Sequence, residues 1–255
     1  MGFFSLNHGV IPACDVNTLD DLGELIKDVD DVKGIVAYKA GKRLQSRYSL
    51  PLLVKTVEAH TSKPMIFDAQ KEGNDVEFTE KDFIADYAAD GVKTLILFPF
   101  AGPRVQATCV KACLDNGILP IGGFRLTQKG WDETEEVELG DIDPRLGGRK
   151  FRGYITKDAE QRALELYALM NVQHYVGPAN KPEQLKTMNE TLISHSINPH
   201  FFMPGVGRQG GSILVAFETV KGCAGAYGIV GSEIYKAENR AEAAEKFCEE
   251  ALKFE

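Results

Sequence analysis

The sequence of 255 residues lacks the features that mark membrane-spanning and nucleic-acid-binding proteins. No apolar run approaches the roughly 20 residues that a membrane-spanning helix needs. Basic residues are in deficit, with 29 against 37 acidic ones, and a net charge of −8 disfavours binding to a nucleic-acid backbone. A single small anion is still compatible, because backbone N–H groups and one or two cations can bind a phosphate inside an acidic protein.

Cysteine is scarce, and its spacing carries no metal or redox motif. The five cysteines include no C-x-x-C pair, and Cys109 and Cys113 are four residues apart within a helical pattern. This spacing predicts two packed thiols rather than a disulfide or a metal site. The N-terminus has neither the basic segment nor the long apolar segment of a signal peptide. We therefore expect a cytoplasmic protein.

Short apolar runs alternate with helical patterns along almost the whole chain. The runs are rich in Val, Ile, Leu and Phe, which is typical of strands buried in a parallel sheet. Eight strands are predicted, at Gly9 to Asp15, Gly34 to Ala40, Pro64 to Gln70, Val92 to Pro99, Ile118 to Phe124, His174 to Pro178, His200 to Pro204 and Ala226 to Gly231.

The helical patterns lie between and after these strands, with apolar residues recurring at three and four positions. They cover Leu19 to Val29, Ser49 to Thr61, Thr79 to Ala89, Pro103 to Asn116, Lys157 to Asn171, Pro182 to Ser196, Ser212 to Lys221 and Arg240 to Phe254. Eight strands, each followed by a helix, predict an α/β protein in which residues 1–255 form a single (β/α)8 TIM barrel. An open doubly wound sheet is less favoured, because no glycine-rich dinucleotide fingerprint follows the first strand.

One interval interrupts this regular alternation. Trp131 to Gly153, between the fifth strand and the fifth helix, has an acidic first part and a basic, glycine-rich second part. Connections this long are usually functional or disordered. We therefore predict an insertion at about 131–153, either an element that helps to close the active site or a surface excursion.

Charged side chains follow several of the predicted strands. In a barrel the active site lies at the carboxyl ends of the strands, so these positions are candidates for chemistry. Lys39 and Asp68 lie near the carboxyl ends of the second and third strands, and Lys71 and Asp75 follow the third. Lysines and aspartates from neighbouring strands can form a paired charge cluster, which is costly to bury and is usually kept for function. Asp15 ends the first strand, and Thr127 follows the fifth.

Two glycine-rich turns follow the seventh and eighth strands, where many barrels bind a phosphate. Glycines let backbone N–H groups approach the oxygens of an anion. The sequence therefore predicts a phosphate site. Its candidate residues are Gly205, Gly207, Arg208, Gln209, Gly210, Gly231 and Ser232.

Together these residues resemble orotidine 5′-phosphate decarboxylase, in the ribulose-phosphate-binding barrel family, over nearly the whole chain. The family has a lysine after strand two and an Asp-x-Lys-x-x-Asp motif after strand three. Here Lys39 is followed by Asp-x-x-Lys-x-x-x-Asp from Asp68 to Asp75, with one residue added in each interval, as in a divergent, archaeal-like branch. The closing motif has Ser232 where the family usually has arginine, and we expect Arg208 to supply the missing cation.

The resemblance implies a decarboxylase that converts orotidine 5′-monophosphate to UMP and CO2 in pyrimidine biosynthesis, with no metal or organic cofactor. Lys71 would protonate the pyrimidine carbon C6, Asp68 would face the substrate carboxylate and Lys39 would orient Asp68. In this family the second aspartate of the motif enters the neighbouring subunit's site, which implies a homodimer that shares Asp75.

The resemblance further places Asp15 on the ribose and Thr127 on the pyrimidine. Two alternatives stay open. One is a Mg²⁺-dependent sugar-phosphate decarboxylase or synthase on the same barrel, which Lys39 and Lys71 disfavour because ammonium groups compete with a cation for carboxylates. The other is a non-catalytic nucleotide-binding barrel.

Overall fold

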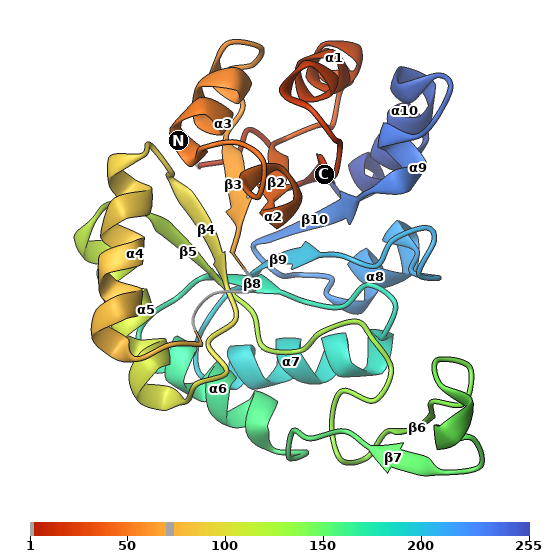
Figure 1. Cartoon of the computed structure of the whole chain (residues 1–255). Helices are drawn as coiled ribbons and strands as arrows, with labels where there is room; N and C mark the ends of the chain where they lie inside the picture. Colours follow the sequence, from red (N-terminus) through yellow and green to blue (C-terminus); the bar gives the residue numbers. More distant parts are fainter. Residues whose placement is uncertain (1–2, 70–73) are drawn as a thin grey trace.

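Eight parallel strands curve into a barrel in the computed structural model, which describes residues 3–69 and 74–255 (Figure 1). The strands are β1 (His8–Pro12), β2 (Tyr38–Gly41), β3 (Met65–Asp68), β4 (Thr94–Leu97), β5 (Leu119–Gly122), β8 (His174–Val176), β9 (His200–Met203) and β10 (Gly225–Val230). Their order in the sheet is β1-β10-β9-β8-β5-β4-β3-β2. Two parallel bridges, Val10 to Ile35 and Ala13 to Lys39, join β1 to the β2 segment and close the barrel.

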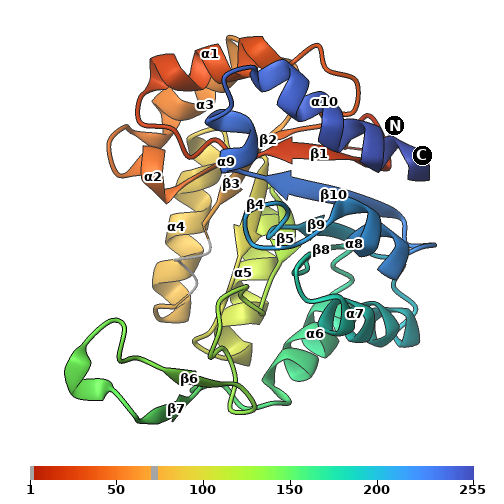
Figure 2. The same ribbon diagram turned by 90° about the vertical axis from the view of Figure 1, so that its right-hand side faces the viewer.

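Helices surround the barrel on its outside (Figures 1 and 2). They are α1 (Leu19–Val29), α2 (Lys42–Gln45), α3 (Leu50–Glu58), α4 (Glu77–Ala89), α5 (Pro103–Asp115), α6 (Ala159–Leu169), α7 (Pro182–Ser194), α8 (Ile213–Thr219), α9 (Ser232–Tyr235) and α10 (Arg240–Ala251). Helix α1 illustrates the local cause. A capping box between Thr18 and Asp21 satisfies its first N–H groups, and its apolar positions are buried against the barrel.

The core has two parts that follow the period-two alternation of the strands. In β4, Leu95 and Leu97 belong to the layer between sheet and helices, whereas Ile96 belongs to a second cluster. That second cluster fills the barrel interior with one or two side chains from most strands. Phe4 packs on two of its aromatic rings, Phe202 and Tyr227. The barrel is therefore a packed core rather than a channel.

The predicted fold is confirmed, and each predicted strand overlaps an observed one. The third predicted strand ends at Gln70, which lies outside the described residues. The short helices α2 and α9 were not predicted, because four residues are too few to show a helical period. The five cysteines are free, so the prediction of packed thiols at Cys109 and Cys113 is confirmed. No helix of the described chain is long and apolar enough to cross a membrane.

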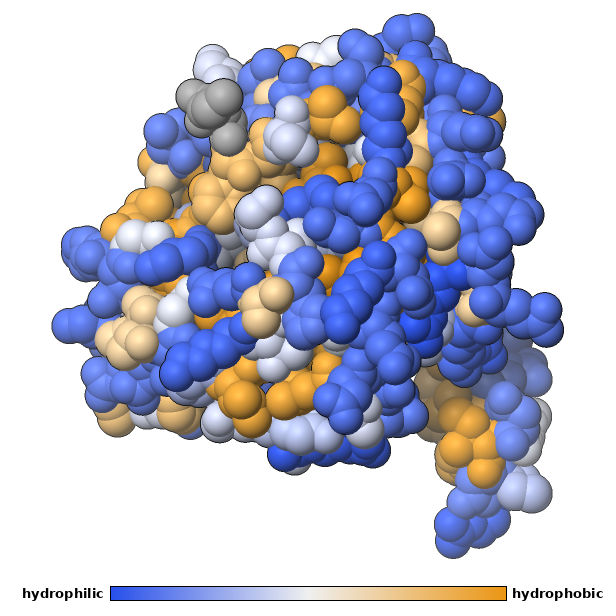
Figure 3. All heavy atoms as spheres, turned by 90° about the horizontal axis from the view of Figure 1, so that it is seen from above, coloured by the Kyte–Doolittle hydropathy of each residue, from blue (hydrophilic) through white to orange (hydrophobic). Residues whose placement is uncertain are grey.

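The insertion contains regular structure that the sequence pattern did not indicate. Strands β6 (Glu136–Glu138) and β7 (Lys150–Arg152) pair as an antiparallel hairpin, and a 3-10 turn at Pro144–Leu146 lies between them. A second 3-10 turn, outside the insertion, follows α10 at Leu252–Phe254. The hairpin projects away from the barrel in Figures 1 and 2 and stands clear of the body when seen from above (Figure 3). The insertion is therefore a surface excursion along most of its length.

Candidate active site

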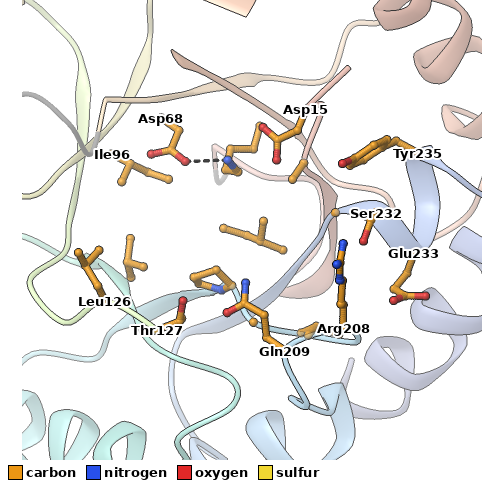
Figure 4. Close-up of a pocket in the computed structure, with 18 of the residues that line it drawn as sticks. Asp15, Asp68, Ile96, Leu126, Thr127, Arg208, Gln209, Ser232, Glu233 and Tyr235 are labelled. Atoms are coloured by element: carbon orange, nitrogen blue, oxygen red, sulfur yellow. Dashed lines mark hydrogen bonds and ion pairs between the residues drawn. The ribbon is translucent and has the colours of Figure 1, made fainter. Parts of the chain in front are cut away.

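A cavity of about 610 Å³ lies at the carboxyl ends of the strands. It brings together residues that are far apart in the sequence and that the sequence analysis singled out. The predicted residues that line it are Asp15, Lys39, Asp68, Thr127, Gly205, Arg208, Gln209, Gly231 and Ser232. Figure 4 shows Leu126 and Thr127 on one side of this cavity, Arg208, Ser232 and Glu233 on the other, and Asp15 and Asp68 above the space between them.

The charge pair of Lys39 and Asp68 lies between these two sides. The register of the parallel strands β2 and β3 places Lys39 opposite Ile66, and the lysine Nζ donates a hydrogen bond of 2.6 Å to Asp68 Oδ2. Both side chains are about nine-tenths buried. Burial alone would lower the pKa of Lys39, but the carboxylates of Asp68 and Asp15 outweigh it and raise that pKa. The lysine therefore stays an ammonium group at neutral pH.

Asp15 is held beside this pair by the edge where the barrel closes. The backbone N–H of Cys14 donates to the Lys39 carbonyl at 2.8 Å, so the end of β1 lies against β2. The Cys14 thiol is buried, and burial raises its pKa to about 12. The neutral Cys14 thiol therefore acts as a packing group. The polar group that the end of β1 contributes to the cavity is the carboxylate of Asp15.

Arg125 also lines the cavity, and the sequence analysis missed it. Its side chain is only 7% exposed and contacts three carboxylates, those of Asp132, Glu135 and Glu160. Burial works against ionisation of Asp132, but hydrogen bonds from Thr134 and Arg125 lower the pKa of this carboxyl group. Burial raises the pKa of Glu160 in spite of the attraction of Arg125. Its position could have indicated a role in the site, because Arg125 lies three residues after the end of β5.

The glycine-rich loop after β9 folds back on itself. The N–H of Gly207 donates to the Gly211 carbonyl, and the N–H of Gly211 donates to the Gly205 carbonyl, both at 2.9 Å. A Cβ atom on Gly211 would lie 2.5 Å from the Gly205 carbonyl oxygen, so glycine is required for this close approach. The turn places Arg208 and Gln209 at the cavity wall, with Gln209 between Thr127 and Arg208 in Figure 4.

Residues after β10 complete this side of the cavity. Ser232, Glu233 and Tyr235 belong to α9 and line the wall beside Arg208. Glu233 was not among the predicted residues, although its position three residues after β10 was available as a signal. Arg208 thus shares this wall with the hydroxyl of Ser232 and the carboxylate of Glu233.

Four predicted residues are not in the cavity wall that the structure describes. Lys71 lies outside the described residues. Asp75 is elsewhere, because its backbone N–H donates to Glu80 Oε1 at 2.9 Å and its carboxylate accepts from the N–H of Val76 at 2.7 Å. Gly207 and Gly210 belong to the loop after β9, where both have positive φ angles of +75° and +86° and shape its turn.

The arrangement suits an anionic ligand with two distinct ends. One wall offers the Thr127 hydroxyl beside the apolar Leu126, and the other offers Arg208 and a glycine-rich turn. The Lys39 ammonium group lies directly against Asp68 and so occupies a position that a divalent cation would need. Within residues 3–69 and 74–255, no group of three His, Cys, Asp or Glu side chains is arranged to hold a metal ion.

Residues 9–247 match the family model described as "Orotidine 5′-phosphate decarboxylase / HUMPS family". The chain is 36% identical over 242 residues to the orotidine 5′-phosphate decarboxylase of Methanococcoides burtonii, covering 94% of this chain and 96% of that protein.

Solved structures share the fold. That of orotidine 5′-monophosphate decarboxylase from Methanocaldococcus jannaschii, complexed with the inhibitor BMP, gives a TM-score of 0.73 at 21% identity, over 95% of this chain and 98% of that one. The enzyme from Pyrococcus horikoshii gives 0.69 at 21% identity, over 95% and 99% of the two chains.

Proposed function

The chain belongs to the orotidine 5′-phosphate decarboxylase / HUMPS family, and we propose that it converts orotidine 5′-monophosphate to UMP and CO2 in pyrimidine biosynthesis. The observation that carries this proposal is the buried pair of Lys39 and Asp68 in a cavity that Thr127 lines on one side and Arg208 on the other. The enzyme is a carboxy-lyase that needs no cofactor in this scheme.

The cavity offers a different set of groups to each end of a nucleotide. A volume of about 610 Å³ is within the range of small-molecule sites. The Thr127 hydroxyl can hydrogen-bond the pyrimidine, Asp15 can accept from a ribose hydroxyl, and Arg208 with Gln209 can bind the phosphate. The reacting carbon C6 then lies near Asp68, because the base and the phosphate occupy opposite walls.

The reaction is the replacement of a carboxylate by a proton. The bond between C6 and the carboxylate breaks, CO2 leaves, and the electron pair stays on C6, where a proton from the Lys71 ammonium group forms the new C–H bond. Asp68 repels the substrate carboxylate in the ground state, and this repulsion is relieved as CO2 departs. Lys39 holds Asp68 in position through their 2.6 Å hydrogen bond.

The phosphate end has a different set of groups from the usual family pattern. Ser232 provides a hydroxyl in place of arginine, and Arg208 enters the same wall from the preceding loop. We propose that Arg208 is the phosphate cation, supported by backbone N–H groups of the glycine-rich turn that do not already bond within it. Phosphate binding remote from C6 supplies energy for orienting the base.

We propose a homodimer in which Asp75 enters the partner's site. Asp75 is outside the cavity of its own chain, which supports a role in a neighbouring one. The residues that follow it expose apolar area, with Val76 at 48%, Phe78 at 69% and Phe83 at 43% exposure, and such surface favours association with a second copy.

A cytoplasmic location fits the same proposal. All five cysteines are free, and four of the five are buried, which suits a reducing compartment.

One assay tests the proposed function against its alternatives. The purified protein is incubated with orotidine 5′-monophosphate, with and without EDTA, and the loss of substrate absorbance is followed. We expect turnover that EDTA does not change. Turnover abolished by EDTA would indicate the Mg²⁺-dependent alternative, and tight binding of UMP without any turnover would indicate a non-catalytic binding protein.

A further inference from the structure

The side chain of Arg125 joins three separate segments at the edge of the cavity. Its Nη2 atom donates to Asp132 Oδ2 at 2.8 Å, its Nε atom donates to Glu160 Oε2 at 2.6 Å, and its Nη1 atom lies 3.6 Å from Glu135 Oε1. Asp132 and Glu135 are at the base of the insertion, and Glu160 is in α6. A buried charge is costly unless it is paired, and each of the three nitrogen atoms of this planar guanidinium faces a carboxylate.

A second cation contacts the same loop. Lys181, which follows β8, donates from Nζ to Glu135 Oε1 at 3.0 Å and to the Gln128 carbonyl at 3.3 Å. The Glu135 carboxylate also accepts from the backbone N–H of Gly130 at 2.9 Å. Both ends of the loop from residue 125 to residue 135 are therefore held by ion pairs, Arg125 at one end and Glu135 at the other.

Aromatic packing adds a third constraint on this loop. The Trp131 ring is buried, and its centroid lies 5.2 Å from that of Phe100 and 6.0 Å from that of Phe124. Thr127 lies between the Arg125 contacts and the Trp131 packing, so its freedom to move away from the cavity is restricted on both sides of it in the sequence.

Arg125 is suited to positioning rather than to binding substrate. Three carboxylates already face its donor groups, so little of its charge is available to an anionic ligand. We propose that Arg125, through its contacts with Asp132, Glu135 and Glu160, is the positioning residue that holds Thr127 against the nucleobase and ties the base of the insertion to the active site. The nucleobase part of this inference rests on the proposed function.

The test compares two ligands that share the phosphate but differ in the base. Affinities for UMP and for ribose 5-phosphate are measured for the wild type, Arg125→Met and Arg125→Lys, together with hydrogen exchange of residues 123–135. We expect Arg125→Met to bind UMP about tenfold more weakly, the size of one lost hydrogen bond, while ribose 5-phosphate binding changes by less than about twofold. Exchange in 123–135 should become faster, and Arg125→Lys should recover part of both effects.

Control variants separate positioning from general loss of stability. Arg162→Lys changes an exposed arginine of α6 that pairs with Asp158 and Thr156, and it should leave both affinities and the exchange unchanged. Should Arg125→Met fail to fold, Glu160→Gln keeps the side-chain shape, removes one charge and should show the same selective loss to a smaller degree.

Two results would overturn the inference. One is a folded Arg125→Met variant with wild-type UMP affinity and wild-type exchange in 123–135, and the other is an equal loss of affinity for both ligands. A wild-type protein that binds UMP but does not decarboxylate orotidine 5′-monophosphate contradicts only the proposed function, because exchange and UMP affinity still decide the role of Arg125.

Discussion

Two stacked histidines at the amino-terminal ends of β8 and β9 predict a barrel that loses stability in mild acid. The rings of His174 and His200 are 4.8 Å apart and 14° from parallel, and the Tyr227 hydroxyl lies 3.4 Å from His200 Nδ1. Burial, together with the charge on His200 when it is protonated, lowers the pKa of His174 from 6.5 to about 4. Burial also lowers the pKa of His200.

Whether acid stabilises or destabilises the barrel depends on whether the folded or the unfolded chain binds the proton at the higher pH. The pKa of His174 is lower in the folded chain than in the unfolded chain, so the unfolded chain is protonated first as the pH falls. The stabilising contribution is complete above pH 6.5 and is lost as the pH falls toward 4. Between pH 7 and pH 5, His174 alone should lower the free energy of unfolding by about 2 kcal/mol.

His174→Phe tests this magnitude, because phenylalanine keeps a ring against His200 and Phe202 but cannot be protonated. Urea unfolding is followed at pH 7 and pH 5 by the fluorescence of Trp131, the single tryptophan. The loss of unfolding free energy between the two pH values should be about 2 kcal/mol smaller in the variant, or roughly 0.7 M urea in the midpoint for an m value near 3 kcal/mol/M.

The same substitution at the exposed His195 is the matched control for exchanging a histidine ring for phenylalanine away from the stacked pair. Titrating groups remote from His174 contribute equally to both proteins and cancel in the comparison, whereas His200 stacks on the substituted ring and titrates together with His174 in the wild type. An equal loss of stability in the wild type and in His174→Phe would refute the reasoning.

Three further predictions concern the active site. Arg208→Ala should raise the KM for orotidine 5′-monophosphate by about ten- to a hundredfold with a smaller effect on kcat, and an unchanged KM in steady-state assays would exclude Arg208 as the phosphate cation. Lys71→Ala and Asp75→Ala, each inactive alone, should recover about a quarter of wild-type activity when unfolded and refolded together in equal amounts, since half of the dimers then hold one complete site. No recovery on refolding would contradict shared sites. Lys39→Ala should lower kcat/KM by at least about a thousandfold, because Asp68 loses its positioning ammonium group. A loss of less than tenfold would show that Lys39 is dispensable.

The strand and helix pattern was predictable because burial imposes it locally. Strands covered on both faces need continuous apolar runs, and surface helices need apolar residues at three and four positions, so both signals are present in short windows of sequence. The hairpin of β6 and β7 gave no such signal, since its strands have three residues each and alternate around the half-buried Val137 and Phe151. A two-stranded element outside the core has too few buried positions to show a period.

The candidate site was predictable where it depends on residues at strand ends. Lys39 and Asp68 are charges directly at the ends of buried runs, which is an unusual place for a charge unless it is paired. Arg125 was missed because its partners are 7, 10 and 35 residues away in sequence, and no local pattern indicates that they converge.

The sequence by itself determined the (β/α)8 architecture, the family and the end of the barrel where the polar residues gather. Each of these follows from the order of residues along the chain, because period and motif spacing are local properties. Only the tertiary structure decided that Lys39 bonds Asp68 at 2.6 Å, that Arg208 shares a wall with Ser232, and that Arg125 ties the insertion to the cavity. These facts depend on distances between side chains on different strands and loops, which closure of the barrel brings together.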